Sequence, residues 1–330
     1  MLTIRDFNNS DADYQACIAI WNANHGTTQP EILQQWKDRD RHLGKTHPIS
    51  RLVGEIDGQV VCYGQYAEES WAYQPGKYIW DFGINPEVEP CAILPQLYEK
   101  IVGLLLGHGA FKILVNARSD ETYRVVFIES QGYRQIQREP TSWLDVTQFQ
   151  PAKFEEVIER INGNGIQIYS VAQLSEMDPN WLRKLHVIVE AARMDVPAEE
   201  PPSPLAFEEF ASRVNDPNDR ATHKTRFVAV DTKTSDEDGL GKYVGVTNLR
   251  YNVVDSTLAH TGLTGMARAY RRQGIATALK VHSISQAKAD GVRRIDTDND
   301  ENNPMLDLNL KLEFQPGPIK LLYEKVIEPS

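Results

Sequence analysis

The sequence predicts two tandem α/β domains, each with a central mixed, mostly antiparallel sheet flanked by helices. Three observations lead to this fold class. The chain has 330 residues, about twice the length of a typical single domain. Each half mixes strand-type and helix-type apolar spacing. The order of these segments in the first half recurs from Gly165 onward, which indicates a duplicated domain.

The first half is expected to fold in the order β-α-α-β-β-β-α-β-α-β. Ile18 and Trp21 have the spacing of a buried helix face. Asp57-Gly58 is a strong hairpin turn signal, and Gly132 ends the last helix. The expected elements are a strand (2–7), helices (14–24 and 31–39), strands (50–56, 59–67 and 77–84), a helix (92–106), a strand (111–117), a helix (121–131) and a final strand.

The second half repeats this order with longer connections. The expected elements are a strand (166–171), a helix (179–192), a hairpin (227–231 and 243–250), a strand (258–266), a helix (275–290), a strand (293–298), a helix (303–312) and a strand (319–327). The hairpin connection covers residues 232–241, and residues 197–204 form a proline-rich loop. The predicted domains are therefore residues 1–148 and 165–330, joined by a linker helix within residues 149–164.

Composition excludes several classes of protein. Hydrophobic residues make up 41% and charged residues 25% of the chain, the balance of a globular protein. Arg5, Asp6 and Asp11 interrupt the place where a signal peptide would need an apolar core, and the longest apolar run is too short to span a membrane. We therefore expect a cytoplasmic protein without membrane segments. Three cysteines without a C-x-x-C pair predict neither disulfides nor a metal site.

The charge distribution bears on partners. The formal net charge is −11, and acidic residues exceed basic ones in both halves. Because the chain has no basic stripe with interleaved aromatic residues, we expect no nucleic acid partner. An acidic protein weakly favours a cationic substrate.

One segment, residues 264–276, carries most of the functional information. It lies between a predicted strand and a predicted helix, and a helix N-terminus offers unpaired N–H groups and a partial positive charge. Gly274 and Ala276 are small enough for a diphosphate to approach the backbone. Arg271, Arg272 and Gln273 can add side-chain donors. We interpret this segment as a diphosphate-binding loop without a Walker lysine, against the alternative of an ordinary solvated turn.

With Arg271, Gly274 and Ala276, the segment resembles the Q/R-x-x-G-x-G/A motif of the GNAT superfamily of acyl-CoA N-acyltransferases. The downstream run is similar to tandem GNAT proteins, the group that includes mycothiol synthase. This run contains Thr297, Asn299, Asn303, Met305, Asn309, Leu312 and Phe314. The motifs cover only about residues 258–316, although the fold resemblance covers nearly the whole chain.

The resemblance implies direct attack of an amine on the thioester of acetyl-CoA, with no metal. It also implies the cofactor-binding residues. The backbone near Gly265 and Met266 would bind the pantetheine arm, and Asn303 would contact the same region. The backbone N–H groups of Arg272 to Ala276, with Ile275 among them, would bind the diphosphate.

The catalytic groups are not determined by the sequence. Many GNAT enzymes have a tyrosine acid on the last helix, where this chain has Asn309. Asn309 cannot protonate a thiolate but can still donate a hydrogen bond, so it is itself a candidate catalytic residue. His260 on the strand before the motif, Asp298 after the next strand and Tyr270 beside the loop are weak candidates for the base. For each of them, a purely structural role is the alternative.

The first half departs from the motif. Residues 85–92 contain no glycine and no arginine, and Glu87 and Glu89 stand where phosphates would bind. We therefore predict that only the C-terminal domain binds acyl-CoA. The leading hypothesis is an N-acetyltransferase that acts on a small-molecule amine. A non-catalytic acyl-CoA-binding or sensing protein and a structural protein with two relic folds are the alternatives. The acceptor, the acyl chain and the oligomeric state stay open, with a homodimer among the options.

Overall fold

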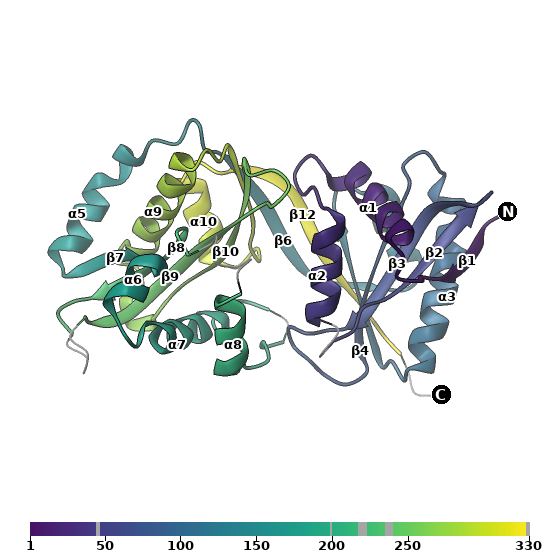
Figure 1. Ribbon diagram of the computed structural model, residues 1–330, viewed down its shortest axis with the longest axis horizontal. Coiled ribbons are helices and arrows are strands. Elements are labelled where there is room, and N and C mark those ends of the chain that lie inside the picture. The colour runs from purple at the N-terminus through teal and green to yellow at the C-terminus, as the bar shows by residue number, and fades with distance from the viewer. Residues whose placement is uncertain (44–46, 199, 217–222, 235–239, 328–330) are drawn as a thin grey trace. The chain divides into compact units, whose positions relative to one another are not determined.

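The structure is a computed structural model that describes residues 1–43, 47–198, 200–216, 223–234 and 240–327. The chain forms two compact units. Unit 1 comprises residues 1–139 and 318–330, and unit 2 comprises residues 140–317. Each unit has its own hydrophobic core. Figure 1 shows the elements with the labels used below.

Unit 1 is built on the sheet order β1-β2-β3-β4-β5-β12. All neighbouring strands are antiparallel except the parallel pair β4 and β5. The strands are β1 (Thr3–Asp6), β2 (Ser50–Ile56), β3 (Gln59–Glu68), β4 (Lys77–Ile84), β5 (Lys112–Arg118) and β12 (Gln315–Val326), and the helices are α1 (Asp11–His25), α2 (Leu33–Leu43), α3 (Leu94–Gly107) and α4 (Thr122–Ser130).

Alternation along the strands divides the core of unit 1 into two layers. Cys62 on β3 packs in the cluster that contains α3, whereas its neighbour Tyr63 packs against α1 and α2. Successive strand residues point to opposite faces, so one strand contributes to both layers. The sheet is therefore covered on both sides, by α1 and α2 on one face and by α3 on the other.

Unit 2 repeats the architecture with the sheet order β6-β11-β10-β9-β8-β7. Only β10 and β11 are parallel. The strands are β6 (Arg134–Asp145), β7 (Ile166–Ser170), β8 (Arg226–Asp231), β9 (Lys242–Tyr251), β10 (Leu258–Met266) and β11 (Arg294–Asp298). The helices are α5 (Glu155–Gly163), α6 (Val171–Met177), α7 (Trp181–Arg193), α8 (Phe207–Val214), α9 (Ile275–Ala289) and α10 (Pro304–Lys311). The predicted fold class is thus confirmed in both units.

The two faces of the unit 2 sheet are covered by different helices, as Figure 1 shows. Val281 and Ile284 of α9 pack on one face together with Ala259 of β10. Ile188 and Ala192 of α7 pack on the other face with strand residues of β8 and β9. We refer to these as the α9 face and the α7 face.

The last strands are exchanged between the two halves of the sequence. β6 follows α4 of the first half, yet its residues 141–145 pair with β11. β12 ends the second half, yet residues 320–326 pair with β5. The boundaries of the compact units therefore differ from the predicted domains 1–148 and 165–330. Each unit obtains an antiparallel neighbour for its second parallel strand from the other half of the chain.

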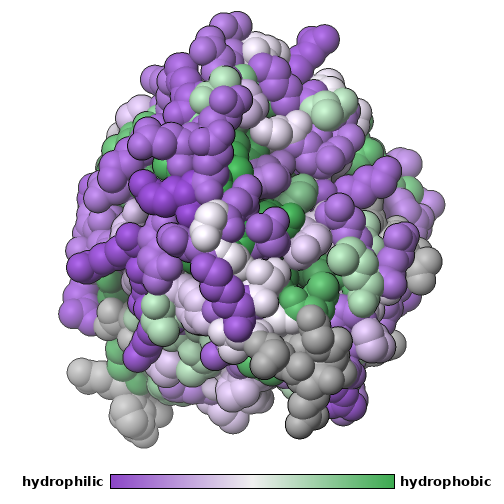
Figure 2. Space-filling model, turned by 90° about the vertical axis from the view of Figure 1, so that its left-hand side faces the viewer, coloured by the Kyte–Doolittle hydropathy of each residue, from purple (hydrophilic) through white to green (hydrophobic). Residues whose placement is uncertain are grey.

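The strand and helix positions agree closely with the expected ones, with two additions in unit 2. α6 begins at a capping box in which Ser170 and Gln173 bond each other's backbone N–H groups, and α8 follows the proline-rich loop. The expected hairpin connection at residues 232–241 lies partly outside the described residues. None of the described helices is long and apolar enough to cross a membrane. The face drawn in Figure 2 is mostly polar, with only small separate apolar patches outside the grey atoms.

Candidate functional site

The site begins where two parallel strands separate. β10 pairs with β9 along its length, but with β11 only from Leu258 to His260. The pairing of β10 with β9 shifts register between Thr261 and Thr264, which marks a bulge that bends the strand. From Thr261 to Met266, no strand among the described residues pairs with the second edge of β10. This open edge offers backbone N–H and C=O groups to an extended ligand.

The loop after β10 presents backbone N–H groups at the start of α9. Gly274 is the N-cap of α9 with φ of 88°, and Arg272 also has a positive φ of 60°. The structure shows no acceptor within the described residues for the N–H groups of residues 272–277. Consecutive unpaired N–H groups at a helix N-terminus form an anion-binding site. The residues present therefore fit a diphosphate group.

The guanidinium groups around this loop differ in their partners. Arg271 and Arg268 both pair with Asp195, and the Arg268 contact holds the pKa of that carboxyl below its usual value. The sequence did not indicate Asp195. Arg272 is exposed, and no partner is seen for it in the described part of the chain. Arg160 of α5 also reaches the loop, because a Cβ atom placed on Gly274 would lie 2.9 Å from its Nη2.

The other predicted cofactor residues lie along the same path, mostly through their main chains. A Cβ atom on Gly265 would meet Cβ of Ala192 at 2.3 Å, so only glycine allows β10 to approach α7 so closely. Met266 and Ile275 are buried, and their side chains belong to the core. Gln273 donates a hydrogen bond to the carbonyl of Ala269. Ala276 packs beside the same core cluster.

The structure brings two of the candidate bases together. His260 and Asp298 lie 2.9 Å apart, from Nε2 to Oδ1, at the point where β10 and β11 separate. His260 lies on the α7 face, because the preceding residue, Ala259, packs against α9. Tyr270 is engaged elsewhere. Its hydroxyl donates to Asp231, and this bond raises the pKa of the phenol, so the phenol keeps its proton.

Asn303 and Asn309 of the downstream run have structural partners. The Asn303 side chain accepts a hydrogen bond from the Met305 N–H and caps α10, which leaves its amide NH₂ group for a ligand. Asn309 is fully buried. Its Oδ1 accepts a hydrogen bond from Nζ of Lys280 at 2.8 Å, and its Nδ2 donates to Oδ1 of Asn299 at 2.6 Å. Lys280 is buried, and the sequence motifs did not indicate it.

Comparison with known proteins agrees with this geometry. Residues 188–314, which include the open edge of β10, the loop and α10, match the acetyltransferase (GNAT) family. The match covers the motif-bearing part of the C-terminal unit and less than half of the chain. Acyl transfer is therefore the class of chemistry that the C-terminal unit supports. A search of the curated proteins finds no match.

The whole chain has the fold of tandem GNAT proteins. A GCN5-related N-acetyltransferase from Sphaerobacter thermophilus superposes with a TM-score of 0.71 at 17% identity, covering 100% of this chain and 96% of that one. A tandem GNAT protein from the clavulanic acid biosynthesis pathway gives a TM-score of 0.71 at 17% identity, with 100% of both chains covered. A fungal glucosamine N-acetyltransferase region gives 0.70 at 15% identity, covering 98% of this chain and 38% of that one. At these identities the likeness establishes the fold alone.

In unit 1, a buried arginine lies where the two parallel strands separate, the position that corresponds to the open edge of β10. β4 and β5 separate after Trp80. Arg124 of α4 is buried there, and it donates to the carbonyls of Phe82 at 2.9 Å and Asn116 at 2.8 Å. Its guanidinium also pairs with Asp81. The backbone acceptors that an extended ligand would need in this GNAT-like unit are therefore already engaged.

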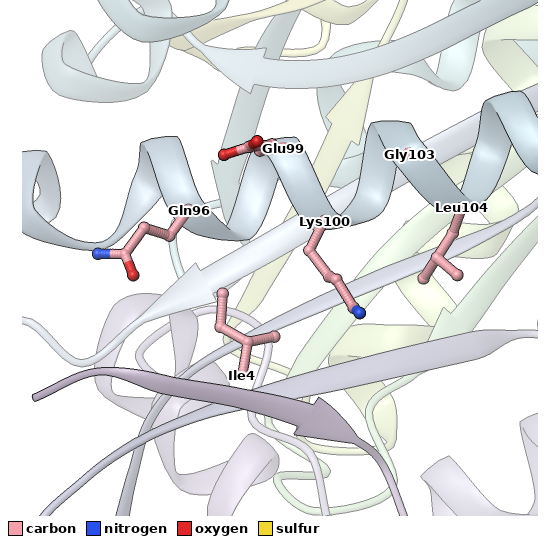
Figure 3. Close-up of a pocket in the computed structure, with 6 residues that line it drawn as sticks. All are labelled: Ile4, Gln96, Glu99, Lys100, Gly103 and Leu104. Carbon is pink, nitrogen blue, oxygen red and sulfur yellow. The ribbon is translucent and has the colours of Figure 1, made fainter.

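Unit 1 also has a surface groove, but its residues do not form a chemical site. The groove lies between α3 and β1 and has a volume of about 500 Å³. Figure 3 shows Gln96, Lys100 and Leu104 on α3 above Ile4, whereas the Glu99 carboxylate points away from the strand. The described residues contain no group of three side chains that could hold a metal ion.

Proposed function

We propose that the protein is an N-acetyltransferase that transfers the acetyl group of acetyl-CoA to a primary amine of a small molecule by direct attack. The observation that carries this proposal is the continuity of the open edge of β10 with the N–H groups at the start of α9. A diphosphate at the helix and an extended arm along the strand would place the thioester near the dyad of His260 and Asp298.

The binding roles follow from the contacts. The unpaired N–H groups of residues 272–276 would hold the diphosphate, with Arg272 and Arg160 as further cations. The main chain of Gly265 and Met266 would pair with the pantetheine arm. The free amide group of Asn303 is a further donor for the arm.

The dyad of His260 and Asp298 can remove a proton from the acceptor amine. An alkyl ammonium has a pKa of about 10.4, so it must lose a proton before its nitrogen can attack the thioester carbon. His260 can accept this proton, and Asp298 stabilises the imidazolium that forms. The two side chains lie on the α7 face, so we expect the amine to approach from that side.

A non-catalytic acyl-CoA-binding protein is the second candidate, and one observation favours it. The amide oxygen and the amide nitrogen of Asn309 are both hydrogen-bonded inside the protein. An amide is also not an acid, so this position of α10 cannot protonate the leaving thiolate. Turnover of any amine would exclude this candidate. Binding of acetyl-CoA without turnover of a broad amine panel would favour it.

The test is calorimetric titration of acetyl-CoA into the wild type and into Gly274→Glu, which places a carboxylate in the loop. We expect one site per chain in the wild type, since Arg124 fills the unit 1 cleft, and loss of binding in the variant. Gly291→Glu is the matched control, because Gly291 has φ of 89° and follows the opposite end of the same helix. Both variants carry the same charge and similar backbone strain.

The two variants separate a local effect from a folding defect. Equal melting temperatures with binding lost only in Gly274→Glu would support the diphosphate site. No binding to the wild type would overturn the proposed function. Two sites per chain would contradict the assignment of the active unit.

A further inference from the structure

Lys280 is a buried amine on α9 that the proposed function has not used. The residue is 4% exposed, and its Nζ donates to Oδ1 of Asn309 at 2.8 Å. The ring centroid of Phe314 lies 5.6 Å from the same nitrogen. The described residues provide no carboxylate partner for it, and burial lowers its pKa to about 7. A buried cation without a counter-charge costs stability, so a functional reason for it is expected.

The side chains that line the same void as Lys280 are uncharged. Lys280 lines a void too small to hold a water molecule, together with Thr247 of β9, Thr261 of β10 and Ser283 of its own helix. Asn309 contacts its Nζ from α10, and Phe314 lies beside it. No acceptor is seen in the described part of the chain for the two remaining N–H bonds of its ammonium form. Lys280 is therefore the titratable group of this space.

This space touches the point where the strands separate. His260 is the last residue of β10 that pairs with β11, and Thr261 is the next. Lys280 thus approaches this point from the α9 face, whereas the dyad of His260 and Asp298 lies on the α7 face. An arm that started at the α9 N-terminus and followed the open edge from Met266 toward Thr261 would end near both groups.

We propose that Lys280 donates the proton that the sulfur of CoA takes up when the thioester breaks, with Asn309 as the positioning residue that holds the ammonium group. This inference rests on the proposed function. The amine nitrogen forms a bond to the carbonyl carbon, the carbon–sulfur bond breaks, and its electron pair goes to sulfur. Lys280 gives its proton to that sulfur and becomes a neutral amine.

Solvent takes up the protons that the amine loses and returns one to Lys280. The substrate ammonium loses two protons on becoming an amide. His260 takes these protons and passes them to solvent, and Lys280 is reprotonated from solvent as product leaves. A thiol has a pKa of about 8.5 and the buried Lys280 one of about 7, so a proton can pass between an ammonium and a thiolate held side by side. Groups on opposite faces thus handle the amine and the thiol.

CoA itself, without an amine, tests the proposal. CoA is bound to an excess of the protein, and thiolate absorbance in the ultraviolet is followed as pH rises, with desulfo-CoA as the blank. An ammonium beside the sulfur stabilises the thiolate, and the thiolate in turn raises the pKa of the ammonium, so the two charges persist together. We expect the bound thiol to ionise in the wild type with an acid dissociation constant at least about tenfold larger than in Lys280→Met. Lys311→Met, which changes an exposed lysine of α10, should match the wild type.

Each outcome gives a decision. A clear difference between the wild type and Lys280→Met supports the proposal. Equal ionisation in both proteins, with CoA bound to both, overturns it and leaves the proposed function intact. Absence of CoA binding to the wild type overturns both. If Lys280→Met fails to fold, Lys280→Gln keeps a donor for Asn309 and provides the same comparison.

Discussion

Single residues set the chemistry of this site, and Lys280 shows the stability cost of doing so. Its neighbours Leu279 and Val281 are buried apolar residues, as expected for a helix packed on a sheet. A lysine in the same layer must be neutral or bear an unfavourable desolvation energy. The single hydrogen bond to Asn309 offsets only part of this energy.

The first prediction concerns Lys280→Met and pH. Burial lowers the folded-state pKa of Lys280 from 10.5 to about 7. Between these values the unfolded chain binds a proton that the folded chain does not, so this residue makes stability rise with pH across that window. Below about pH 7 both states are protonated and the full cost is present. The methionine variant should therefore be more stable than the wild type there, by several kcal/mol at most.

Urea unfolding at about pH 6, 8 and 10 measures this difference. The gain of Lys280→Met should shrink as pH rises toward 10.5, whereas Lys311→Met should show no such trend. A methionine variant that is less stable than the wild type at about pH 6 would show that Lys280 is a favourable structural cation.

Local sequence signals single out the candidate loop but not all of the residues that the fold brings to it. Gly274 and Arg271 were recognisable because the turn, the helix start and the motif lie within one short segment. Lys280 could have been found, since helical spacing places it in one stripe with Ile284 and Ala287. Asp195 and Arg160 could not, because only tertiary folding brings them to the loop.

At the scale of elements, α5 packs against the candidate loop and is more than a linker. Ile158 and Ile161 of α5 pack into the cluster that contains Ile275 and Ala278 of α9. This packing fixes Arg160 beside Gly274. Within the described residues Arg160 has no carboxylate partner, so its guanidinium is available to an anion.

The second prediction is that Arg160→Gln weakens acetyl-CoA binding by about tenfold, the usual size of one charge-assisted hydrogen bond. Acetyl-pantetheine lacks the diphosphate, so its binding should not change. Calorimetry with both compounds at two salt concentrations makes the comparison, and the salt dependence for acetyl-CoA should fall. Lys153→Gln, just before α5, is the control, because Lys153 pairs with Glu313. Equal losses for the two compounds would contradict a contact with the diphosphate.

Most helices and strands could be predicted because their sequence signals are local. The two unpredicted helices of unit 2, α6 and α8, also have local signals. The predicted strands at residues 50–56, 77–84 and 258–266 match β2, β4 and β10. The helix α8 has Phe207, Phe210 and Val214 at helical spacing, a pattern hidden behind the proline-rich loop. The pairing partner of a strand, unlike the strand itself, is not encoded by a local signal. Nothing in the residues of β6 or β12 specifies which parallel strand each will join, because pairing depends on contacts distant in sequence.

At the scale of the whole molecule, strand exchange determines which pieces of the chain can fold. β11 needs β6 as its antiparallel neighbour, and β6 lies before the predicted start of the second domain. A fragment of residues 165–330 would therefore leave one edge of β11 bare and would lack α5. It would also carry β12, whose partner β5 is in the first half. Unpaired strand edges promote aggregation.

The last prediction follows from this connectivity. The fragment 140–317 contains the paired part of β6, α5 and the whole loop. We expect it to unfold cooperatively and to bind acetyl-CoA within about tenfold of the full chain, whereas the fragment 165–330 should aggregate or fail to bind. Circular dichroism during heating and calorimetric titration compare the two. Equal binding by both fragments would mean that neither β6 nor Arg160 supports the site, and the exchange would then matter to unit 1 alone.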